Sequence, residues 1–565
     1  MIHAPSVYDF RRESIFYGPV SDLVPSTPVF EMYPIGFTTI ATHLHNEGYR
    51  VRIVNLASMM LNNSKLDVAA LMEKLDAPVF GLDLHWLPHA QGSLAVASML
   101  KAKHPESKVL FGGLSSSYYH TELIQYPQVD LVLRGDSTEV PLSRLLAILE
   151  SGGSLEEVPN LTWKEGGRLR SNALTFVPED LDYLDIDYGW MIRSVIRRRD
   201  LEGFKPFRDW DRYPLTAVLS VRGCSMNCAV CGGSCFALRG FVSRERPALR
   251  SPEMLARDIR NIQSYLRGTT FVVGDLRQGG GKYLERFFAE VRRLGIENHL
   301  VLEIFTPADR DFYRAASGSL ELFSVQFSPD SHEEPVRHAL GRSFDTPSVE
   351  RTVKYALESE CQRFDLFFMT GLPKQTRDSA LASAEYARRL YSLVDDDPRL
   401  AVYSSPLAPF IDPGSRVFES PEEFGYRLFA RTLEDHRARL LQPSWKYILS
   451  YETAWMTRDD IVAATYDAAD RLNEIRFERG QIDEGTFLGL RERTSVAREI
   501  LSEVDRIVAI PGAEERGRAL ASLKERADAY MESTICEKRG LEWETPGVLK
   551  SVPRLMARLV MGKKE

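Results

Sequence analysis

The chain has 565 residues, of which 44% are hydrophobic and 27% are charged, and its formal net charge is −8. This length exceeds what one hydrophobic core serves, so we expect two or three domains. The acidic balance argues against nucleic-acid binding, which needs a basic face, and the absence of a run of about 18 apolar residues argues against a membrane-spanning helix.

The first ten residues, MIHAPSVYDF, lack the basic and apolar regions of a signal peptide. Six cysteines, four of them clustered, are typical of metal or redox chemistry rather than of a disulfide framework. We therefore expect a cytoplasmic location. The basic, amphipathic end RLMARLVMGKKE offers a peripheral contact with a membrane as an alternative to a frayed terminal helix.

Residues 1–152 alternate short apolar segments with helical ones, which predicts a doubly wound, Rossmann-like α/β domain with a parallel sheet. Helices are expected at 36–49 and 91–104. Glycines close several strand candidates, and ligands bind outside the carboxyl ends of such strands. The predicted strands cover 51–57, 77–84, 108–114 and 129–135.

A polar segment at 153–210, with GGS and EGG turns and an acidic run, is predicted to be a linker. Residues 211–430 return to alternating strands and helices. Six such β/α units favour a (β/α)6 partial barrel, and 431–565 predicts a helical C-terminal region. One barrel helix is expected at 251–266, with Ser251 as its N-cap. The predicted barrel strands cover 215–222, 269–274, 300–305, 321–327, 364–370 and 400–404.

Four cysteines lie in the stretch VRGCSMNCAVCGGSC, directly after the first barrel strand. Cys224, Cys228 and Cys231 form the pattern C-x3-C-x2-C, which lets three thiolates converge on one metal centre. Zinc and iron–sulfur both suit thiolates. A structural zinc site normally has a fourth ligand and paired C-x2-C arms, whereas three cysteines on a four-iron cluster leave one iron open. Cys235 is the candidate fourth ligand.

The triad resembles that of the radical S-adenosylmethionine (radical SAM) superfamily. FFMTGLPKQT (367–376) resembles the fifth-strand motif of that superfamily, and PFIDPGS (409–415) resembles the sixth-strand segment of its cobalamin-binding branch. The resemblance implies a four-iron cluster on the three cysteines and S-adenosylmethionine chelated by its open iron. Reductive cleavage would then yield a 5′-deoxyadenosyl radical that takes hydrogen from an unactivated carbon. Cys235 is then expected to be a bystander.

The same resemblance implies contacts to S-adenosylmethionine. FVVGDLRQGG (271–280) occupies the second-strand end, where the methionine part is held, and SVQFSPDS (324–331) the fourth-strand end, near the ribose. The chain departs from the family pattern in having valine, rather than an aromatic residue, before the third cysteine, and Gly-Asp in place of Gly-Gly-Glu. The implied contacts are Val230, Gly274, Asp275, Ser328, Asp330, Gly371, Leu372 and Pro373.

The N-terminal domain resembles the cobalamin-binding domain of this branch in YPIGFTTIATHL, VLFGGLSSSYY and VDLVLRGDSTEVPLSRLL. Asp83-Leu84-His85 is similar to the start of a histidine motif that ligates cobalt, but the glycine of that motif is missing, so we transfer no ligand role. The implied cobalamin contacts are Pro34, Gly36, His85, Trp86, Gly112, Gly113, Ser115, Gly135 and Asp136.

Nearly the whole chain resembles an uncharacterised group of cobalamin-binding-domain radical SAM proteins. The resemblance implies an enzyme that carries a four-iron cluster, S-adenosylmethionine and cobalamin, and that methylates an unactivated carbon of a small-molecule or lipid-like substrate. An electron donor such as flavodoxin or ferredoxin is its implied partner. Radical cyclisation or rearrangement is the enzymatic alternative, and a zinc-stabilised α/β binding protein is the alternative of another class. No residue is predicted to act as a general base.

Overall fold

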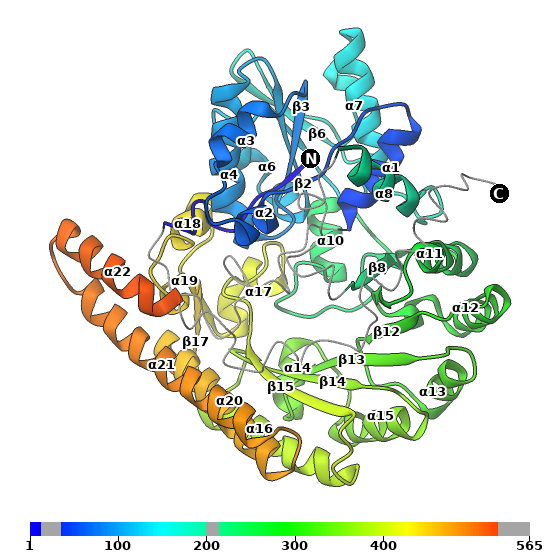
Figure 1. Ribbon diagram of the computed structural model, residues 1–565, viewed down its shortest axis with the longest axis vertical. Coiled ribbons are helices and arrows are strands. Elements are labelled where there is room, and N and C mark those ends of the chain that lie inside the picture. Colours follow the sequence, from blue (N-terminus) through cyan, green and yellow to red (C-terminus); the bar gives the residue numbers. More distant parts are fainter. Residues whose placement is uncertain (13–34, 199–213, 529–565) are drawn as a thin grey trace.

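The computed structural model describes residues 1–12, 35–198 and 214–528. Pro34, one of the predicted cobalamin contacts, and the basic C-terminal end lie outside these ranges. Figure 1 separates the molecule into an N-terminal α/β domain, a second α/β region and a set of long helices along one side. No helix in the described parts of the chain combines the length and the apolarity needed to cross a bilayer.

The N-terminal domain is built on a seven-stranded sheet with the order β2-β1-β3-β4-β5-β6-β7. The first five strands pair in parallel, and β6 and β7 extend the sheet antiparallel. The strands are β1 (Ile2–His3), β2 (Val54–Asn55), β3 (Val79–Asp83), β4 (Lys108–Gly112), β5 (Leu131–Leu133), β6 (Leu161–Glu165) and β7 (Arg168–Ser171). The doubly wound parallel sheet is confirmed, with β1 as a strand that sequence patterning missed.

Helices connect these strands and cover the sheet (Figure 1). They are α1 (Gly36–Asn46), α2 (Leu56–Asn62), α3 (Val68–Lys74), α4 (Ala90–Lys103), α5 (Leu114–Tyr118), α6 (His120–Leu123) and α7 (Glu139–Ser151). The segment 153–210, predicted to be a linker, contains β6, β7 and the helix α8 (Tyr188–Arg198). β7 was not predicted because all four residues of this edge strand are exposed. They therefore lack the alternation of apolar and polar residues that indicates a strand.

The second region contains a six-stranded parallel sheet with the order β15-β14-β13-β12-β11-β8. Its strands are β8 (Thr216–Leu219), β11 (Thr269–Val273), β12 (His299–Ile304), β13 (Phe323–Asp330), β14 (Phe364–Thr370) and β15 (Leu400–Pro406). Because each strand pairs only with its neighbours in sequence order, the sheet is the predicted partial barrel. The short hairpin of β9 (Val221–Arg222) and β10 (Ala248–Leu249) follows β8.

The helices of this region mostly lie along the outer side of its sheet, while the first of them contacts α5 of the N-terminal domain (Figure 1). They are α10 (Cys235–Val242), α11 (Pro252–Tyr265), α12 (Gly281–Leu294), α13 (Arg310–Ser317), α14 (Glu334–Leu340), α15 (Thr346–Glu358) and α16 (Arg377–Leu393). The predicted cap of α11 is confirmed, because the Ser251 hydroxyl accepts a hydrogen bond from the Met254 backbone N–H.

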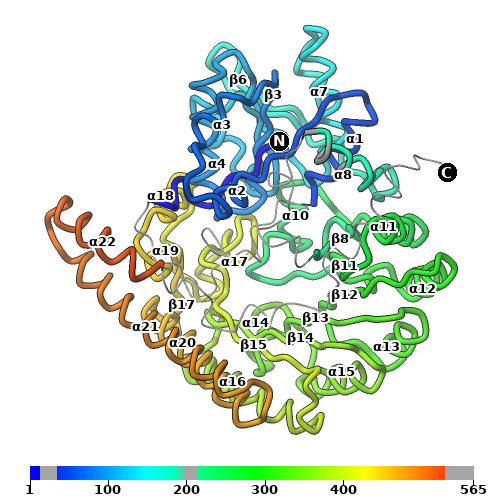
Figure 2. The backbone as a smooth tube through the Cα atoms, viewed as in Figure 1, coloured from blue at the N-terminus to red at the C-terminus, as the bar shows by residue number. Residues whose placement is uncertain are grey.

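The chain after β15 is mostly helical, as predicted. Figure 2 traces it from α17 through three consecutive long helices at the molecular edge, and α20 packs against α16 and β15. The elements are α17 (Arg416–Glu419), β16 (Tyr426–Leu428), α18 (Leu433–Arg439), α19 (Trp445–Ile448), β17 (Tyr451–Thr453), α20 (Arg458–Glu478), α21 (Glu484–Val508) and α22 (Ala513–Asp528).

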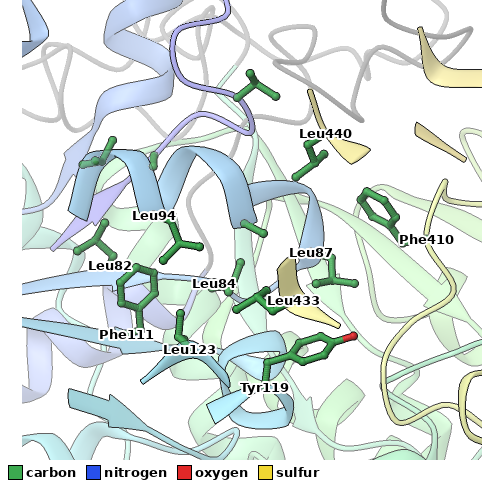
Figure 3. Packing of buried hydrophobic residues seen from close by; sticks show 14 of the residues in the cluster. Leu82, Leu84, Leu87, Leu94, Phe111, Tyr119, Leu123, Phe410, Leu433 and Leu440 are labelled. Carbon is green, nitrogen blue, oxygen red and sulfur yellow. The ribbon is translucent and has the colours of Figure 1, made fainter. Parts of the chain in front are cut away.

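The N-terminal domain and the segment after β15 share one hydrophobic core. Figure 3 shows Leu433 and Leu440, from α18 and its C-terminal end, together with Phe410, among residues of the N-terminal sheet and its helices such as Leu84 and Tyr119. All five side chains are at most 2% exposed. Burial of these apolar side chains favours close association of the two regions. The shared core thus brings the loop after β15 against the carboxyl ends of the N-terminal strands.

Candidate functional site

The three predicted cluster cysteines lie in a loop that leaves the carboxyl end of the first barrel strand. Gly223, with φ of +93°, turns the chain from β9 into this loop. The Cys224 Sγ accepts a hydrogen bond from the Met226 N–H at 3.3 Å, and the Cys231 Sγ accepts one from the Gly233 N–H at 3.3 Å. Cys228 is buried and the other two are half-buried. The backbone thus presents N–H dipoles to two of the sulfur atoms.

Burial raises the pKa of the Cys224 thiol to about 11, and it also raises the pKa of Cys228 and of Cys231. The Arg342 guanidinium acts in the opposite direction on Cys224 and Cys228. Free thiols here are therefore protonated at neutral pH, and a metal centre would have to displace their protons. Backbone N–H donors and a nearby guanidinium suit the extra negative charge of a thiolate-bound cluster.

A four-iron cluster and a single metal ion require different positions of the three thiols. Among the described residues, no three His, Cys, Asp or Glu side chains come close enough to share one ion. A four-iron cluster does not require that convergence, because each thiolate binds a different iron. Cys235 begins helix α10, where the Ser234 hydroxyl caps the helix and the Cys235 N–H donates to the Met226 carbonyl.

Two predicted S-adenosylmethionine contacts lie at the end of β11. Gly274 has φ of +92°, and its N–H donates to the Glu303 carboxylate at 2.9 Å. Asp275 is 4% exposed, and both of its carboxylate oxygens are already bonded, to Arg277 and to the Phe305 N–H. Glu303 on β12 therefore places a second carboxylate at this strand end, and the contact of Asp275 with S-adenosylmethionine stays a prediction. Burial raises the pKa of Glu303.

The strand ends of β13 and β14 hold the other predicted contacts. The register of the β13–β14 pair shifts between Phe327 and Asp330, so Ser328 lies in an irregularity of the strand. The Asp330 carboxylate accepts a hydrogen bond from the Arg342 Nε at 3.0 Å. Arg342, which no motif indicated, lies near Cys228, Asp330 and Glu303 and supplies positive charge to this side of the site.

The G-L-P segment after β14 is held rigidly. Gly371 has φ of +104°, and the Gln375 side chain accepts hydrogen bonds from the Gly371 and Leu372 N–H groups. Leu372 packs with Val336, Leu340 and the half-buried Val230 in one apolar cluster, while Pro373 is buried beside it in sequence. Val230 and Leu372 are thus brought together, as two predicted contacts of one ligand would have to be.

On the N-terminal domain, His85 follows β3 and is held by Asp83. The Asp83 carboxylate lies 2.8 Å from the His85 Nδ1 and 3.1 Å from the His3 Nδ1. Burial alone would raise the pKa of Asp83, but the charges and hydrogen bonds of His3 and His85 outweigh it and hold that pKa well below its usual range. The His85 side chain remains 34% exposed. A carboxylate–histidine pair of this kind fixes the orientation of the ring.

The neighbouring strand ends carry the predicted glycines. Gly112 ends β4, and Gly113 has φ of +113°; a Cβ there would lie 2.5 Å from the His85 backbone. Ser115 begins the following turn of helix and is buried. Gly36 begins α1, with open space around it. The close approach of the β3 and β4 ends therefore depends on Gly113.

Asp136, predicted to contact cobalamin, pairs with Arg244 of the barrel region. The Arg244 Nη2 donates to the Asp136 Oδ1 at 2.8 Å, and its Nε also bonds this carboxylate. Gly135, with φ of +110°, donates its N–H to the Ser117 hydroxyl. Asp136 thus forms a contact between the two domains, and its contact with cobalamin stays a prediction.

A cavity lies between the two sets of residues. Its lining residues come from the N-terminal domain, from the loop after the third cysteine with α10, and from the loop after β15. They are His85, Trp86, Leu114 and Ser115, then Gly232, Gly233 and Phe241, and finally Asp412 and Pro413. Three residues of the predicted cobalamin set, His85, Trp86 and Ser115, therefore meet Gly232, the neighbour of Cys231, at one site.

Asp412 joins the two walls of this cavity and was not among the predicted site residues. Its carboxylate accepts a hydrogen bond from the Gly232 N–H at 2.9 Å and interacts with the Trp86 side chain. Burial raises the pKa of Asp412, and these two hydrogen bonds oppose that rise. The PFIDPGS segment was the signal in the sequence that pointed to this loop. The wall formed by Asp412, His85 and Ser115 is polar, and the space beside it measures about 70 Å³, so it would admit only a part of a large ligand.

Comparisons with known proteins show what parts of this chain are similar to. The model of the B12 binding domain matches residues 23–142. An uncharacterized methyltransferase from Pyrococcus horikoshii is 24% identical over 202 residues, which cover 36% of this chain and 40% of that relative's length.

Two solved structures share the fold. The radical S-adenosylmethionine methyltransferase TsrM from Kitasatospora setae, with cobalamin and a [4Fe–4S] cluster bound, has a TM-score of 0.56 and 12% identity, over 91% of this chain and 98% of that one. The cobalamin-dependent S-adenosylmethionine radical enzyme OxsB, with aqua-cobalamin and S-adenosylmethionine bound, has a TM-score of 0.53 and 10% identity, over 99% of this chain and 79% of that one. The chain therefore contains a region that matches the B12 binding domain, and its overall fold is similar to that of these two enzymes.

Proposed function

We propose that this chain is a cobalamin-dependent radical SAM enzyme that methylates an unactivated carbon of a small-molecule or lipid-like substrate. The observation that carries the proposal is the cavity between His85 and Trp86 on one wall and Gly232 and Gly233 on the other. Because Gly232 directly follows Cys231, this cavity adjoins both the expected corrin face and the cluster loop. A ligand bound there would contact the groups of both domains.

When bound, the cluster with S-adenosylmethionine supplies a 5′-deoxyadenosyl radical, and cobalamin supplies the methyl group. The chain's own residues bind and orient these groups. Asp83 fixes the ring of His85 at the cavity wall. Arg342 and Glu303 place opposite charges near the strand ends beside the cysteines, where the ammonium and carboxylate of an amino acid would find complementary partners.

Methylation is favoured over cyclisation or rearrangement by the names of the relatives. TsrM and the Pyrococcus relative are both described as methyltransferases. An electron donor such as flavodoxin or ferredoxin, and a cytoplasmic location, remain predictions that follow from the need to reduce the cluster and from the free cysteines.

The test is anaerobic purification and reconstitution with iron, sulfide, hydroxocobalamin and S-adenosylmethionine. We expect iron and cobalamin to bind, S-adenosylmethionine to be cleaved to 5′-deoxyadenosine, and a cell extract to yield a product heavier by one methylene unit. Cleavage with a product of unchanged carbon count would support the rearrangement alternative. A colourless protein with one zinc and no iron would contradict the proposal and support the binding-protein alternative.

A further inference from the structure

Two ion pairs tie the ends of the cluster-bearing segment to a single turn of the B12-binding domain. Arg222 lies two residues before Cys224, and its Nη1 and Nη2 donate to the Glu139 carboxylate at 3.0 and 2.6 Å. Arg244, just after α10, bonds both carboxylate oxygens of Asp136. Asp136 lies in the turn between β5 and α7, and Glu139, at the end of this turn, is the first residue of α7. The segment 222–244 is therefore anchored at both ends to this turn.

Both pairs are buried. The side chains of Arg222 and Glu139 are 10% and 1% exposed, and those of Arg244 and Asp136 are 3% and 12% exposed. Charges are tolerated at such positions only when they are paired and hydrogen-bonded, so each pair opposes separation of the domains.

Further hydrogen bonds fix the geometry of the first pair. The Glu139 carboxylate also accepts from the Thr39 hydroxyl at 2.6 Å and from the Tyr183 hydroxyl at 3.1 Å. Arg222 donates to the Tyr183 hydroxyl at 3.0 Å as well. Three segments of the chain, namely α1, the residues before α8 and β9, thus converge on the Glu139 carboxylate at the start of α7. This network is more rigid than a single ion pair on the surface.

The anchored segment forms one wall of the cavity. It contains all three cluster cysteines, together with Gly232, Gly233 and Phe241, while the facing wall contains His85 and Trp86 of the anchoring domain. A ligand that contacts both walls can bind only when the walls lie at the distance that they have in the bound state. If the anchors are removed, the free protein samples other separations, and the apparent affinity falls with the fraction that remains competent.

We propose that Arg222, Glu139, Arg244 and Asp136 are positioning residues that hold the cluster loop at the distance at which cobalamin contacts both walls. The inference rests on the proposed function, because it takes cobalamin to be the ligand of the cavity. It assigns to Asp136 and Glu139 a role in joining the domains.

The test compares Glu139→Gln and Asp136→Asn with a matched control, Asp258→Asn. The control breaks another buried ion pair, in which the Arg250 Nε and Nη2 donate to Asp258 at 2.9 and 3.1 Å and the side chains are 1% and 7% exposed. That pair does not line the cavity. The full-length proteins, reconstituted with the cluster, are titrated with hydroxocobalamin by absorbance, and thermal unfolding is measured in parallel.

We expect Kd for hydroxocobalamin to rise by about 5- to 150-fold in each anchor variant, as for a coupling between domains of ordinary strength. The control should lower the unfolding temperature and leave Kd unchanged. At saturating cobalamin, the electron paramagnetic resonance signal of cob(II)alamin beside the reduced cluster should also lose its relaxation enhancement in the anchor variants.

An unchanged Kd in Asp136→Asn would overturn the inference, and so would a rise in Kd of the same size in the control. If Glu139→Gln does not fold, the result for Asp136→Asn decides. Failure of the proposed function would look different, because the wild-type protein itself would then bind no hydroxocobalamin or hold no iron.

Discussion

The cluster loop and the strand ends of the N-terminal sheet face the same cavity, but they are built in different ways. The loop places its three cysteines within eight residues, and its own backbone N–H groups bond two of the sulfur atoms. The opposite wall combines the ends of β3 and β4 with His85, which is held by Asp83, and Asp83 is itself bonded to His3 of β1. A metal site can therefore be local in sequence, whereas the wall that must accommodate a large cofactor depends on tertiary contacts.

The largest effect is expected from a substitution that removes one ligand of the cluster and leaves the N-terminal wall of the cavity unchanged. Cys231→Ala should abolish loading of iron and cleavage of S-adenosylmethionine, because one of the three proposed thiolate ligands of the cluster is lost. Iron analysis and detection of 5′-deoxyadenosine measure both losses.

Cys235→Ala is the matched control within the same segment and should retain iron and cleavage. If it loses the cluster as completely as Cys231→Ala, the three-cysteine assignment is wrong.

Glu139→Gln removes one of the two ion pairs that connect the two walls. Burial alone would raise the pKa of Glu139, but the charge of Arg222 and its hydrogen bonds lower that pKa to about 2, from an ordinary value of 4.5. The carboxylate therefore stabilises the fold above about pH 4.5, and this stabilisation is lost as the pH falls towards 2. Removing the charge of Glu139 leaves the buried Arg222 guanidinium without its ionic partner. We therefore expect a loss of about 3–5 kcal/mol in the free energy of unfolding at neutral pH.

Urea unfolding of the apo-protein at several pH values measures this effect. The difference between wild type and Glu139→Gln should shrink between about pH 4.5 and 2. Glu150→Gln, at the exposed end of the same helix, should follow the wild-type curve throughout. A difference that stays constant across this pH range would mean that Glu139 does not stabilise the fold through its charge.

Gly113→Ala is expected to disrupt the wall of the cavity that the N-terminal domain forms. The new Cβ would lie 2.5 Å from the His85 backbone at a φ of +113°, and neither can be relieved by rotation of a side chain. We expect a loss of about 3 kcal/mol in unfolding free energy, together with weaker binding of hydroxocobalamin. Gly240→Ala, in open space on helix α10, should instead stabilise slightly, by about 0.5–1 kcal/mol. Wild-type stability in Gly113→Ala would contradict the close approach of the two strand ends.

The smallest effect is expected from a substitution that removes one contact between the walls. Trp86→Phe keeps most of the ring but deletes the N–H that bonds Asp412, so binding of hydroxocobalamin should weaken by about 3- to 10-fold. Trp455→Phe, at an exposed residue outside the cavity, is the control and should bind like wild type. An absorbance titration decides between them, and equal Kd values for the two variants would remove Trp86 from the binding site.

Much of the architecture followed from local patterns. All six barrel strands, the cap of α11 and the parallel N-terminal sheet were predictable, because apolar runs and capping residues act within a few positions of one another. The edge strand β7 was not, since its exposed residues form a strand only by pairing with β6. The two-residue strand β1 was missed for a similar reason, as it gains its structure from β2 and β3 on either side.

By itself, the sequence determined the cysteine triad, the order of the domains and the glycines at the strand ends, because each is set by spacing along the chain. Only the tertiary structure decided that Asp136 and Glu139 pair with arginines of the barrel, 108 and 83 residues away, and that Asp412 reaches the Gly232 N–H across 180 residues. Charge pairs of this kind have no periodicity or spacing in the sequence. They form because burial of the shared core brings the two regions together, and a buried charge then requires its partner.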